Sequence, residues 1–444
     1  MAADPRLVAI RVLDKVVQQN AYADMVLDAA LNEAGLSGKD SRLVAELVYG
    51  TLRWRGKLEY IIRKIYTSPW ENMPRLIKRI IEMGLYQLIY MDKIPDYAAV
   101  NESVKLGVNM KGMVWGKVVN GVLREYLRSH DWIEFPDIKK DPVAAIASEW
   151  SHPEWLVRRW IDQFGLEKTL SICKANNLRP VLSLRVNRRI TTREKLMEAL
   201  KKKEIVAKAS PYLKDFLEIP RAREVLASEL LKNGLISFQD VSAGLVAILA
   251  DPQPGEVILD IAAAPGGKCC YMGELSDDQS LIVASDLHEQ RMGKVVENIA
   301  RLKLKNVFPV RADGRMISAQ QPDKILIDAP CTGFGVLRRR VDLRWNRNPS
   351  DIEDIVKIQR AMLKDAAQLL KPGGILIYAT CTIEPEENEN IIQEFLKLHP
   401  SFKIESADKF VDKKFVNSEG YIRTWPDQPG LDGSFAVRLI KTIG

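Results

Sequence analysis

The sequence has few of the residues that build disulfide frameworks or metal sites. Five cysteines (an odd number) and four histidines are spread over 444 residues, and no CxxC pair occurs. Small disulfide-rich domains and structural zinc sites need denser, regularly spaced ligands, so both are disfavoured. We therefore expect reduced thiols, a cytoplasmic location and no metal.

Long apolar runs and the residue pattern of a secretory leader are also missing. No stretch of about 18 uncharged apolar residues occurs, so we expect no transmembrane helix. The first residues, MAADPRLVAIRVLDKV, lack a basic region followed by an apolar stretch, which predicts no signal peptide. Neither GxGxxG nor a P-loop is present, which disfavours a dinucleotide-dependent dehydrogenase and a P-loop nucleotidase.

The composition that remains is that of a folded, multidomain protein, with 46% hydrophobic and 28% charged residues. Its net charge of +7 is unevenly distributed: residues 1–140 carry +4, residues 141–240 carry +5, and the rest carry −2. Any attraction for a polyanion would therefore arise from the first 240 residues. A solvated surface without a partner is the alternative.

Residues 1–135 have the apolar periodicity of an all-helical bundle. Prolines separate the segments, and Asp40 is the expected N-cap of the longest one. Helices are predicted over 5–18, 22–35, 40–65, 72–92, 97–108 and 112–128. The polar segment 130–145, which contains two prolines, is predicted to be a linker.

The sequence pattern of residues 146–240 predicts a module that contains both helices and strands. Two helical patterns, 154–163 and 166–176, precede the strand-like PVLSLRVN, the helical TTREKLMEALKKK and the strand-like FLEIP. This order is typical of a βαβ-like unit. Its lysines, Lys201, Lys202 and Lys203, are either a solvated helix end favoured by the helix dipole or an RNA contact.

Residues 241–444 alternate strands with helices, which predicts an α/β domain with a doubly wound parallel sheet. In such sheets the ligand lies beyond the carboxyl ends of the strands. The predicted strands cover 257–262, 281–286, 307–313, 324–330, 374–380 and 434–440.

Three of these strand ends carry acidic residues. The first leads into Asp-Ile-Ala-Ala-Ala-Pro-Gly-Gly-Lys (260–268), whose two glycines allow a ligand to approach the backbone. Asp286 is placed to accept hydrogen bonds from ribose hydroxyls, and Asp313 from an adenine amino group. A single aspartate is more often a turn or cap residue. Three in register favour a nucleoside cofactor.

Two cysteines, Cys331 and Cys381, follow the fourth and fifth strands. Buried cysteines usually act as small apolar residues, but these two lie in turns that face the expected crevice. A thiolate there is a possible nucleophile if nearby cations lower its pKa. Lys268 and the run Arg338–Arg340 are the candidates for those cations.

At this point the motifs resemble those of a known family. Five strings are similar to motifs of the RNA cytosine-C5 methyltransferases: DIAAAPGGK, DAPCTGFGVLRRR, RW at 344–345, KPGGILIYATCTIEPEENE and FQDVSAGL. The N-terminal strings LVYGTLRWRGKLEYII and IPDYAAVNESVKL resemble the NusB-type RNA-binding domain. Both occur together in the Sun/Fmu (RsmB) branch, which modifies small-subunit ribosomal RNA. Ala262 departs from the pattern, because many relatives have cysteine there.

The resemblance implies three domains: a NusB-like all-α bundle (1–135), a small α+β module of RRM or ferredoxin type (146–240) and a Rossmann-like class I methyltransferase domain (241–444). It implies S-adenosylmethionine as cofactor and 16S ribosomal RNA as partner. Cys381 is then the nucleophile, Cys331 assists product release, Asp328 contacts the cytosine, and Lys268 orients the cysteines. The residues expected to line the methyl donor are Ala262, Ala263, Ala264, Pro265, Gly266, Gly267, Lys268, Asp286, Arg291, Asp313 and Asp328.

The leading hypothesis is therefore a ribosomal RNA cytosine-C5 methyltransferase that acts through a covalent adduct between cysteine and C6. The same chemistry on transfer RNA is a close alternative. A non-catalytic RNA-binding or antitermination factor is the alternative from another class, but it would have no chemical need for both thiols. We expect a monomer that binds neither membrane nor metal.

Overall fold

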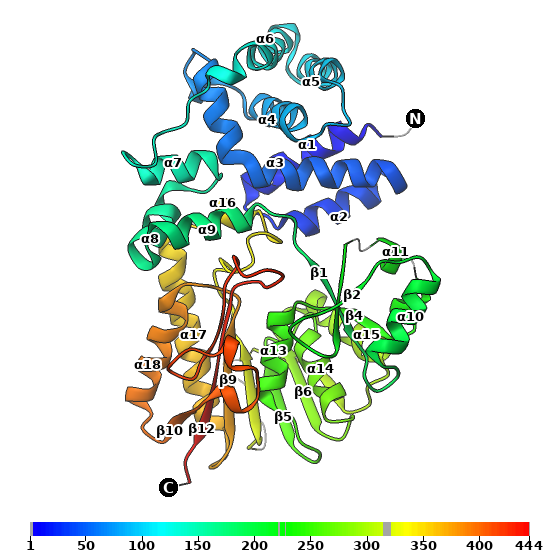
Figure 1. Ribbon diagram of the computed structural model, residues 1–444, viewed down its shortest axis with the longest axis vertical. Coiled ribbons are helices and arrows are strands. Elements are labelled where there is room, and N and C mark those ends of the chain that lie inside the picture. The colour runs from blue at the N-terminus through cyan, green and yellow to red at the C-terminus, as the bar shows by residue number, and fades with distance from the viewer. Residues whose placement is uncertain (1–2, 221–222, 227, 314–320, 444) are drawn as a thin grey trace. The chain divides into compact units, whose positions relative to one another are not determined.

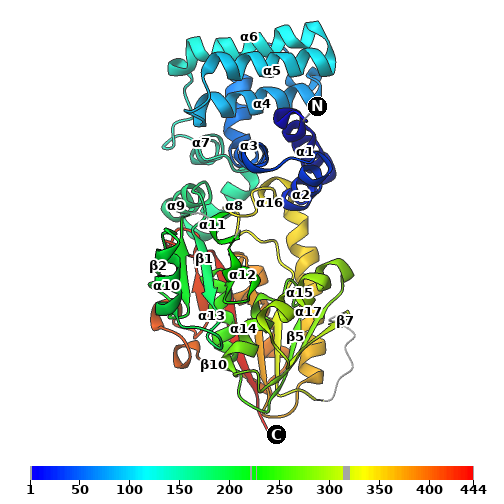
Figure 2. The ribbon, with the colours of Figure 1, turned by 90° about the vertical axis from the view of Figure 1, so that its right-hand side faces the viewer.

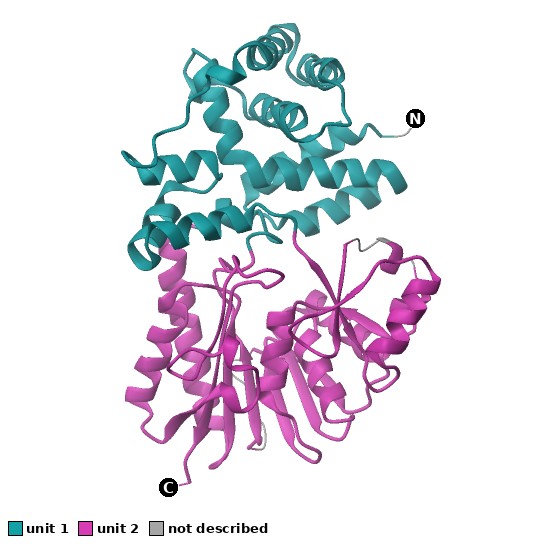
Figure 3. Cartoon of the chain, viewed as in Figure 1, with its two compact units in different colours: residues 1–179, 337–347 teal, residues 180–336, 348–444 magenta. Residues whose placement is uncertain are grey.

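A computed structural model describes residues 3–220, 223–226, 228–313 and 321–443. It contains two compact units, one of residues 1–179 with 337–347 and one of residues 180–336 with 348–444 (Figure 3). Within the described ranges, no helix is long and apolar enough to cross a membrane. Each unit has its own hydrophobic core.

The first unit is helical, and its first six α-helices match the predicted ones to within a few residues. Pro74 and Pro95 immediately precede two of them. At this position a backbone N–H would form no hydrogen bond within the helix, so proline is tolerated. Their apolar faces share one core that includes Leu13, Leu47 and Ile80. The helices, blue to cyan in Figure 1, are α1 (Pro5–Gln19), α2 (Ala23–Glu33), α3 (Gly38–Ile65), α4 (Arg75–Tyr90), α5 (Asp96–Lys111) and α6 (Met113–Ser129), with 3-10 turns η1 (Trp70–Asn72) and η2 (His130–Trp132).

Two local predictions in this unit were wrong. Helix α3 begins at Gly38, so Asp40 lies in its first turn rather than at the N-cap, where its charge still suits the helix dipole. The predicted linker 130–145 contains η2 and the start of α7 (Pro142–Glu149), which Asp141 caps. The unit also contains α8 (Glu154–Phe164), α9 (Leu166–Asn176) and the short α16 (Leu343–Asn346).

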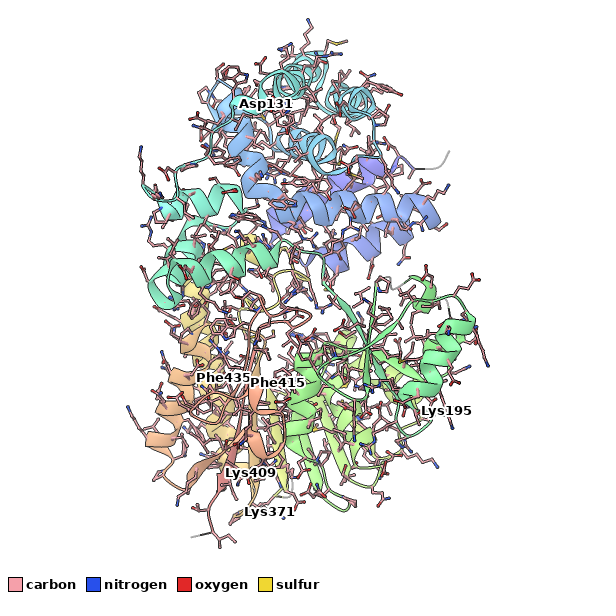
Figure 4. The ribbon with its side chains drawn as sticks, viewed as in Figure 1. Asp131, Lys195, Lys371, Lys409, Phe415 and Phe435 are labelled. Carbon is pink, nitrogen blue, oxygen red and sulfur yellow. The ribbon has the colours of Figure 1, made fainter. Side chains whose placement is uncertain are left out.

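The second unit begins with a small antiparallel sheet of strand order β2-β3-β1-β4. Helix α10 connects β1 to β2, but β3 lies between these two strands, so the predicted βαβ unit is a split one. Its elements are β1 (Leu182–Val186), α10 (Arg193–Lys202), β2 (Lys208–Ala209), β3 (Phe216–Ile219), α11 (Arg223–Leu226), α12 (Glu229–Lys232) and β4 (Ile236–Phe238). Lys195, labelled in Figure 4, is exposed on α10.

The larger sheet has the order β10-β12-β9-β8-β5-β6-β7, with β11 paired to β12, among the described residues. Five neighbouring strands are parallel, and the order reverses between β5 and β8, where ligands bind in open α/β sheets. These strands are β5 (Val257–Ile261), β6 (Leu281–Asp286), β7 (Val307–Arg311), β8 (Lys324–Asp328) and β9 (Ile375–Thr380).

The predicted fully parallel sheet needs one correction. Strand β12 (Ser434–Lys441) pairs antiparallel with both β9 and β10 (Phe402–Glu405), and β11 (Ile422–Thr424) pairs antiparallel with it. The chain returns to this edge through 3-10 turns η4 (Ala407–Lys409) and η5 (Lys413–Phe415) rather than through a crossover helix, which an antiparallel neighbour does not require.

Helices cover the faces of the larger sheet (Figures 1 and 2). Because parallel crossovers are right-handed, the reversal of strand order at β5 puts α14 and α17 on opposite faces. The helices are α13 (Val241–Ala250), α14 (Gly267–Leu275), α15 (Glu289–Leu302), α17 (Pro349–Leu369) and α18 (Glu389–Leu398), and the 3-10 turn η3 (Pro385–Glu387) precedes α18.

Candidate active site

The two cysteines that follow β8 and β9 meet at the carboxyl edge of the sheet. Asp328 at the end of β8 pairs in register with Ala379 of β9, so the turns that follow start at the same level. The sulfur atoms of Cys331 and Cys381 are 3.1 Å apart. Cys381 is exposed and Cys331 is partly buried, so a substrate can reach this pair from solvent.

The other three cysteines lie elsewhere. Cys173 is buried in the first unit, and Cys269 and Cys270 are buried on α14. Burial raises the pKa of Cys173 to a value at which it stays neutral. These thiols therefore act as small apolar side chains.

Lys268 and Asp328 form an ion pair across the topological switch point. Lys268 lies in the first turn of α14, and its Nζ is 2.7 Å from the carboxylate of Asp328. Burial opposes the charged form of Lys268, but Asp328, followed by Asp260 and Cys381, raises its pKa above the ordinary value. Lys268 is therefore a charged ammonium group that interacts electrostatically with Cys381.

Asp260, the first of the three strand-end acids, is a site residue that the list of expected methyl-donor contacts left out. It is fully buried near the end of β5, and no described side chain hydrogen-bonds to its carboxylate, although a backbone hydrogen bond from Cys269 acts on it. Burial, followed by repulsion from Asp328, raises its pKa well above the usual range. The signal was present, because an aspartate in the apolar strand VILDI needs a reason to be there.

The turn after β5 has the backbone shape of a ligand cradle. Ala262 and Gly266 have φ values of +64° and +99°, so this backbone takes a left-handed conformation at two points. The N–H of Ala263 donates to the carbonyl of Ser285 at 2.8 Å, which holds the turn against β6. Ala264, Pro265 and Gly267 complete it, and Gly267 begins α14.

Asp286 and Arg291 support this turn from the next strand and helix. The carboxylate of Asp286 accepts hydrogen bonds from the backbone N–H groups of Ala264 (3.3 Å) and His288 (3.0 Å). Arg291 donates to the carbonyl of Ala264 at 3.0 Å and is 3.5 Å from Asp286. Asp313 lies two residues beyond β7 and is partly buried.

The arginines 338–340 belong to the first unit. Arg340 pairs there with Asp24 at 3.5 Å and lies over the ring of Tyr22, and the carbonyl of Arg338 accepts from Arg53. Lys268, in the second unit, interacts electrostatically with Cys381. Of the cations proposed from the sequence, Lys268 therefore has the clearest structural support.

Three family models match successive parts of the chain. The NusB family matches residues 3–128, the ferredoxin-like domain of RsmF/B-like methyltransferases matches residues 152–226, and the 16S rRNA methyltransferase RsmB/F matches residues 247–440. These three matches follow one another in the order that the sequence motifs predicted. The compact units divide the chain at other residues, so the expected boundaries 1–135, 146–240 and 241–444 stay predictions.

Solved structures share the fold. The crystal structure of PH0851 has a TM-score of 0.80 at 24% identity and covers 99% of each chain. The structure of NSun6 from Pyrococcus horikoshii with SFG has a TM-score of 0.59 at 25% identity, covering 66% of this chain and 99% of the other. The first of these likenesses concerns the fold alone.

Curated relatives match over nearly the full length. The chain is 34% identical over 444 residues to the probable ribosomal RNA small subunit methyltransferase B of Bacillus subtilis, with 98% of each chain covered. It is 35% identical over 441 residues to the ribosomal RNA small subunit methyltransferase B of Cronobacter sakazakii, again with 98% of each covered. The chain therefore belongs to the RsmB/F family of 16S rRNA methyltransferases, with a NusB domain and a ferredoxin-like domain ahead of its methyltransferase domain.

Proposed function

We propose that this chain transfers a methyl group from S-adenosylmethionine to C5 of a cytosine in small-subunit (16S) ribosomal RNA, through a covalent bond between Cys381 and C6 of the base. The observation that carries the proposal is the pair of thiols at 3.1 Å, beside the ion pair of Lys268 and Asp328. The printed names of the relatives from Bacillus subtilis and Cronobacter sakazakii support the RNA substrate.

The residues present fit a nucleoside methyl donor. The buried carboxyl group of Asp260 precedes the Ala262–Gly267 turn and offers polar contacts that the described side chains leave unused. Each carboxylate oxygen has two lone pairs, so Asp286 keeps acceptor capacity for ribose hydroxyls. Asp313 would accept from the adenine amino group, and Arg291 holds the turn in place. When bound, S-adenosylmethionine supplies an electrophilic methyl group on a sulfonium.

Covalent catalysis by Cys381 makes C5 of cytosine reactive. The thiolate adds to C6, and the electrons of the C5–C6 double bond make C5 nucleophilic. Lys268 holds Asp328 in place, and the carboxylate retains acceptor sites for the cytosine amino group. That contact orients the ring over the thiolate.

Cys331 assists breakdown of the adduct. Its hydrogen bond with Cys381, burial and the charges of Cys381 and Glu387 raise its pKa in the free enzyme. When the sulfur of Cys381 is bonded to carbon, that hydrogen bond and that charge are removed, so Cys331, which is only partly buried, can release its proton to solvent water. The Cys331 thiolate then takes the proton from C5, the C5–C6 double bond forms again, and the Cys381 thiolate leaves.

A paired cytosine cannot present C6 to a thiol, so the target nucleotide must be single-stranded or flipped out of its helix. The surrounding RNA needs positively charged protein surface for its phosphates. The net positive charge of residues 1–240 supplies it. These residues include the NusB and ferredoxin-like matches.

The test is incubation of undermodified 16S ribosomal RNA with labelled methyl donor, followed by mapping of 5-methylcytosine. Wild-type protein should label one or a few cytosines, and Cys381→Ala should label none. Cys331→Ala should accumulate a protein–RNA adduct that survives denaturant, because the adduct forms but breaks down slowly.

Two comparisons make this test decisive. Unmodified transfer RNA serves as the second substrate, and preferential labelling of it would overturn the ribosomal RNA assignment. Cys173→Ala, a buried thiol of the first unit, serves as the matched control and should leave labelling unchanged. Transfer that persists in Cys381→Ala would refute the covalent mechanism, and an adduct trapped by that variant would reverse the roles of the two cysteines.

A further inference from the structure

A buried carboxylate, that of Glu387 in η3, lies behind the two thiol turns. Its side chain is fully buried. One oxygen accepts from the backbone N–H of Thr332 at 2.9 Å and from the side-chain amide of Gln359 at 3.1 Å. The other accepts from the hydroxyl of Thr332 at 2.5 Å. Thr332 directly follows Cys331, so Glu387 anchors the first thiol turn.

The same carboxylate is tied to the second thiol turn. The hydroxyls of Thr332 and Thr382 are 2.8 Å apart, and Thr382 directly follows Cys381. Asn388, next to Glu387, donates to the carbonyl of Thr382 at 3.1 Å and accepts from Thr380 at 2.6 Å. Glu387 therefore stands at the centre of a hydrogen-bond network that reaches both cysteines.

Strand β9 holds the backbone of Glu387 as well. The hydroxyl of Tyr378 donates to the carbonyl of Glu387 at 2.7 Å. The ring of Tyr378 packs edge-on against Phe435 of β12, which Figure 4 labels. Glu387 is thus held by a strand through its backbone and by a helix and a turn through its carboxylate, and such support from several elements keeps a site rigid.

Charges of opposite sign act on the two thiols. Glu387 is hydrogen-bonded to the residue after Cys331, and its charge is among the causes that raise the pKa of that thiol. Lys268, a cation, interacts electrostatically with Cys381. When two close thiols share one proton, such a field decides which sulfur keeps it.

We propose that Glu387 is a positioning residue that fixes the geometry of the two thiols and, through its negative charge, keeps their shared proton on Cys331 so that Cys381 is the thiolate. The inference rests on the proposed function only in taking Cys381 as the nucleophile. The preference of the shared proton for Cys331 over Cys381 exists without RNA or methyl donor, so it can be measured in their absence.

The preference should depend on pH in a defined direction. Burial raises the pKa of Glu387 to about 7, against the hydrogen bonds from Thr332 and Gln359 and with a contribution from Glu384. An acid with this pKa is charged above about pH 7 and neutral below it, so its effect on the thiols is present at high pH and lost at low pH. The other titratable groups that act on it or face it are Cys331, Tyr378 and Glu384, and Tyr378 stays neutral because burial raises its pKa well above normal.

The test is alkylation of the full chain with limiting iodoacetamide, without RNA, at about pH 6 and about pH 8.5, followed by mass spectrometry of the peptides that contain Cys331 and Cys381. In Glu387→Gln, the ratio of Cys381 to Cys331 alkylation should fall about tenfold at the higher pH, equivalent to one pKa unit, and should match wild type at the lower pH. The buried Oε1 of Gln359 has no partner among the described residues and can accept from the new amide.

Thr332→Val is the second variant, in case the first does not fold. It removes one donor that stabilises the carboxylate but keeps the charge. The pH at which the alkylation preference appears should therefore rise by about one unit. Glu394→Gln, the same substitution in a carboxylate that pairs with Arg360 on the surface of α18, is the matched control and should behave as wild type.

An unchanged ratio in Glu387→Gln at the higher pH would overturn the inference, and so would an equal change at both pH values. A transition that does not move in Thr332→Val would overturn it as well. The alkylation needs no methyl transfer. Loss of the preference in a protein that methylates no RNA would therefore refute the proposed function and leave this inference standing.

Discussion

At the scale of single residues, several ionisable side chains are fully buried, and their burial affects both stability and the candidate site. Asp260 and Glu387 are both fully buried; Asp260 lies near the Ala262–Gly267 turn, and Glu387 is hydrogen-bonded to the residue after Cys331. Arg344 is equally buried in the first unit. Because an unpaired buried charge is costly, each needs either hydrogen-bond partners or a function. Arg344 has several hydrogen-bond acceptors, whereas no described side chain hydrogen-bonds to the carboxylate of Asp260.

Replacement of Arg344 by methionine should destabilise the first unit by about 4 kcal/mol. The guanidinium donates to the carbonyls of Ser151 (2.9 Å) and Asn176 (3.1 Å) and to the side chain of Asn177 (2.8 Å). Methionine fills the space but leaves these buried acceptors without donors. Urea denaturation, followed by circular dichroism, measures the change.

Arg128→Met is the matched control for this prediction. Arg128 pairs with Glu125 on the exposed surface of α6, and exposed pairs contribute little. We expect a change within about 0.5 kcal/mol. Equal effects of the two substitutions would contradict the role given to Arg344.

At the scale of elements, neighbouring strands and the helices after them bring the site residues together. The parallel pair of β8 and β9 aligns the two cysteine turns, and α14 places Lys268 opposite Asp328. The small antiparallel sheet is connected to this arrangement through Arg185 of β1. Its guanidinium donates to the carbonyl of Gly267 at 2.8 Å and to Glu274 at 2.6 Å.

Arg185→Met should weaken both stability and methyl-donor binding. It leaves the carboxylate of Glu274 buried without its cation, which costs about 3–5 kcal/mol. It also removes the donor that holds the carbonyl of Gly267, the first residue of α14 in the Ala262–Gly267 turn proposed to bind the methyl donor. Chemical denaturation and calorimetric titration with S-adenosylmethionine are the two measurements, and we expect roughly tenfold weaker binding.

The double variant Arg185→Met, Glu274→Leu separates the two effects. With the carboxylate also removed, no uncompensated charge remains, so most of the stability should return. Binding of the methyl donor should stay weak, because the donor to Gly267 is still absent. Full recovery of binding in the double variant would show that Arg185 acts on stability alone.

At the scale of the whole molecule, charge is divided between the parts of the chain. Residues 1–240 are net positive and residues 241–444 are net negative by two. Some basic residues of the first part are used for packing: Arg55 lies over the ring of Trp345 within the first unit. The exposed lysines at the end of α10, Lys201 and Lys202, are free of that role.

Replacement of Lys201, Lys202 and Lys203 by glutamine should weaken RNA binding several-fold. The slope of log affinity against log salt concentration should also become shallower, by about one for each phosphate that these lysines neutralise. Filter binding of 16S ribosomal RNA fragments over a range of salt concentrations measures both. Thermal denaturation of the same variant tests the alternative that the lysines stabilise the C-terminal end of helix α10, in which case the melting temperature should fall.

The matched control replaces Lys409, Lys413 and Lys414, which lie in the part of the chain with net negative charge. This triple variant loses the same charge, and we expect a smaller loss of affinity. If both triple variants lose affinity equally, the charge division has no bearing on RNA binding.

The sequence by itself determined the order of the domains, most helices and strands, and the residues at the strand ends. These depend on local periodicity and on short motifs, which the chain carries in its own order. It also indicated that Cys331 and Cys381 meet, because both follow neighbouring strands of one sheet.

Only the tertiary structure decided the rest. The pairing of β12 antiparallel to β9, the split order of the small sheet and the membership of residues 337–347 in the first unit depend on contacts between distant residues. The network around Glu387 joins Thr332, Gln359 and Thr382, which lie far apart in sequence. The burial of an acidic residue and its hydrogen-bond partners depend on how distant parts of the chain pack together, so a local sequence motif cannot predict them.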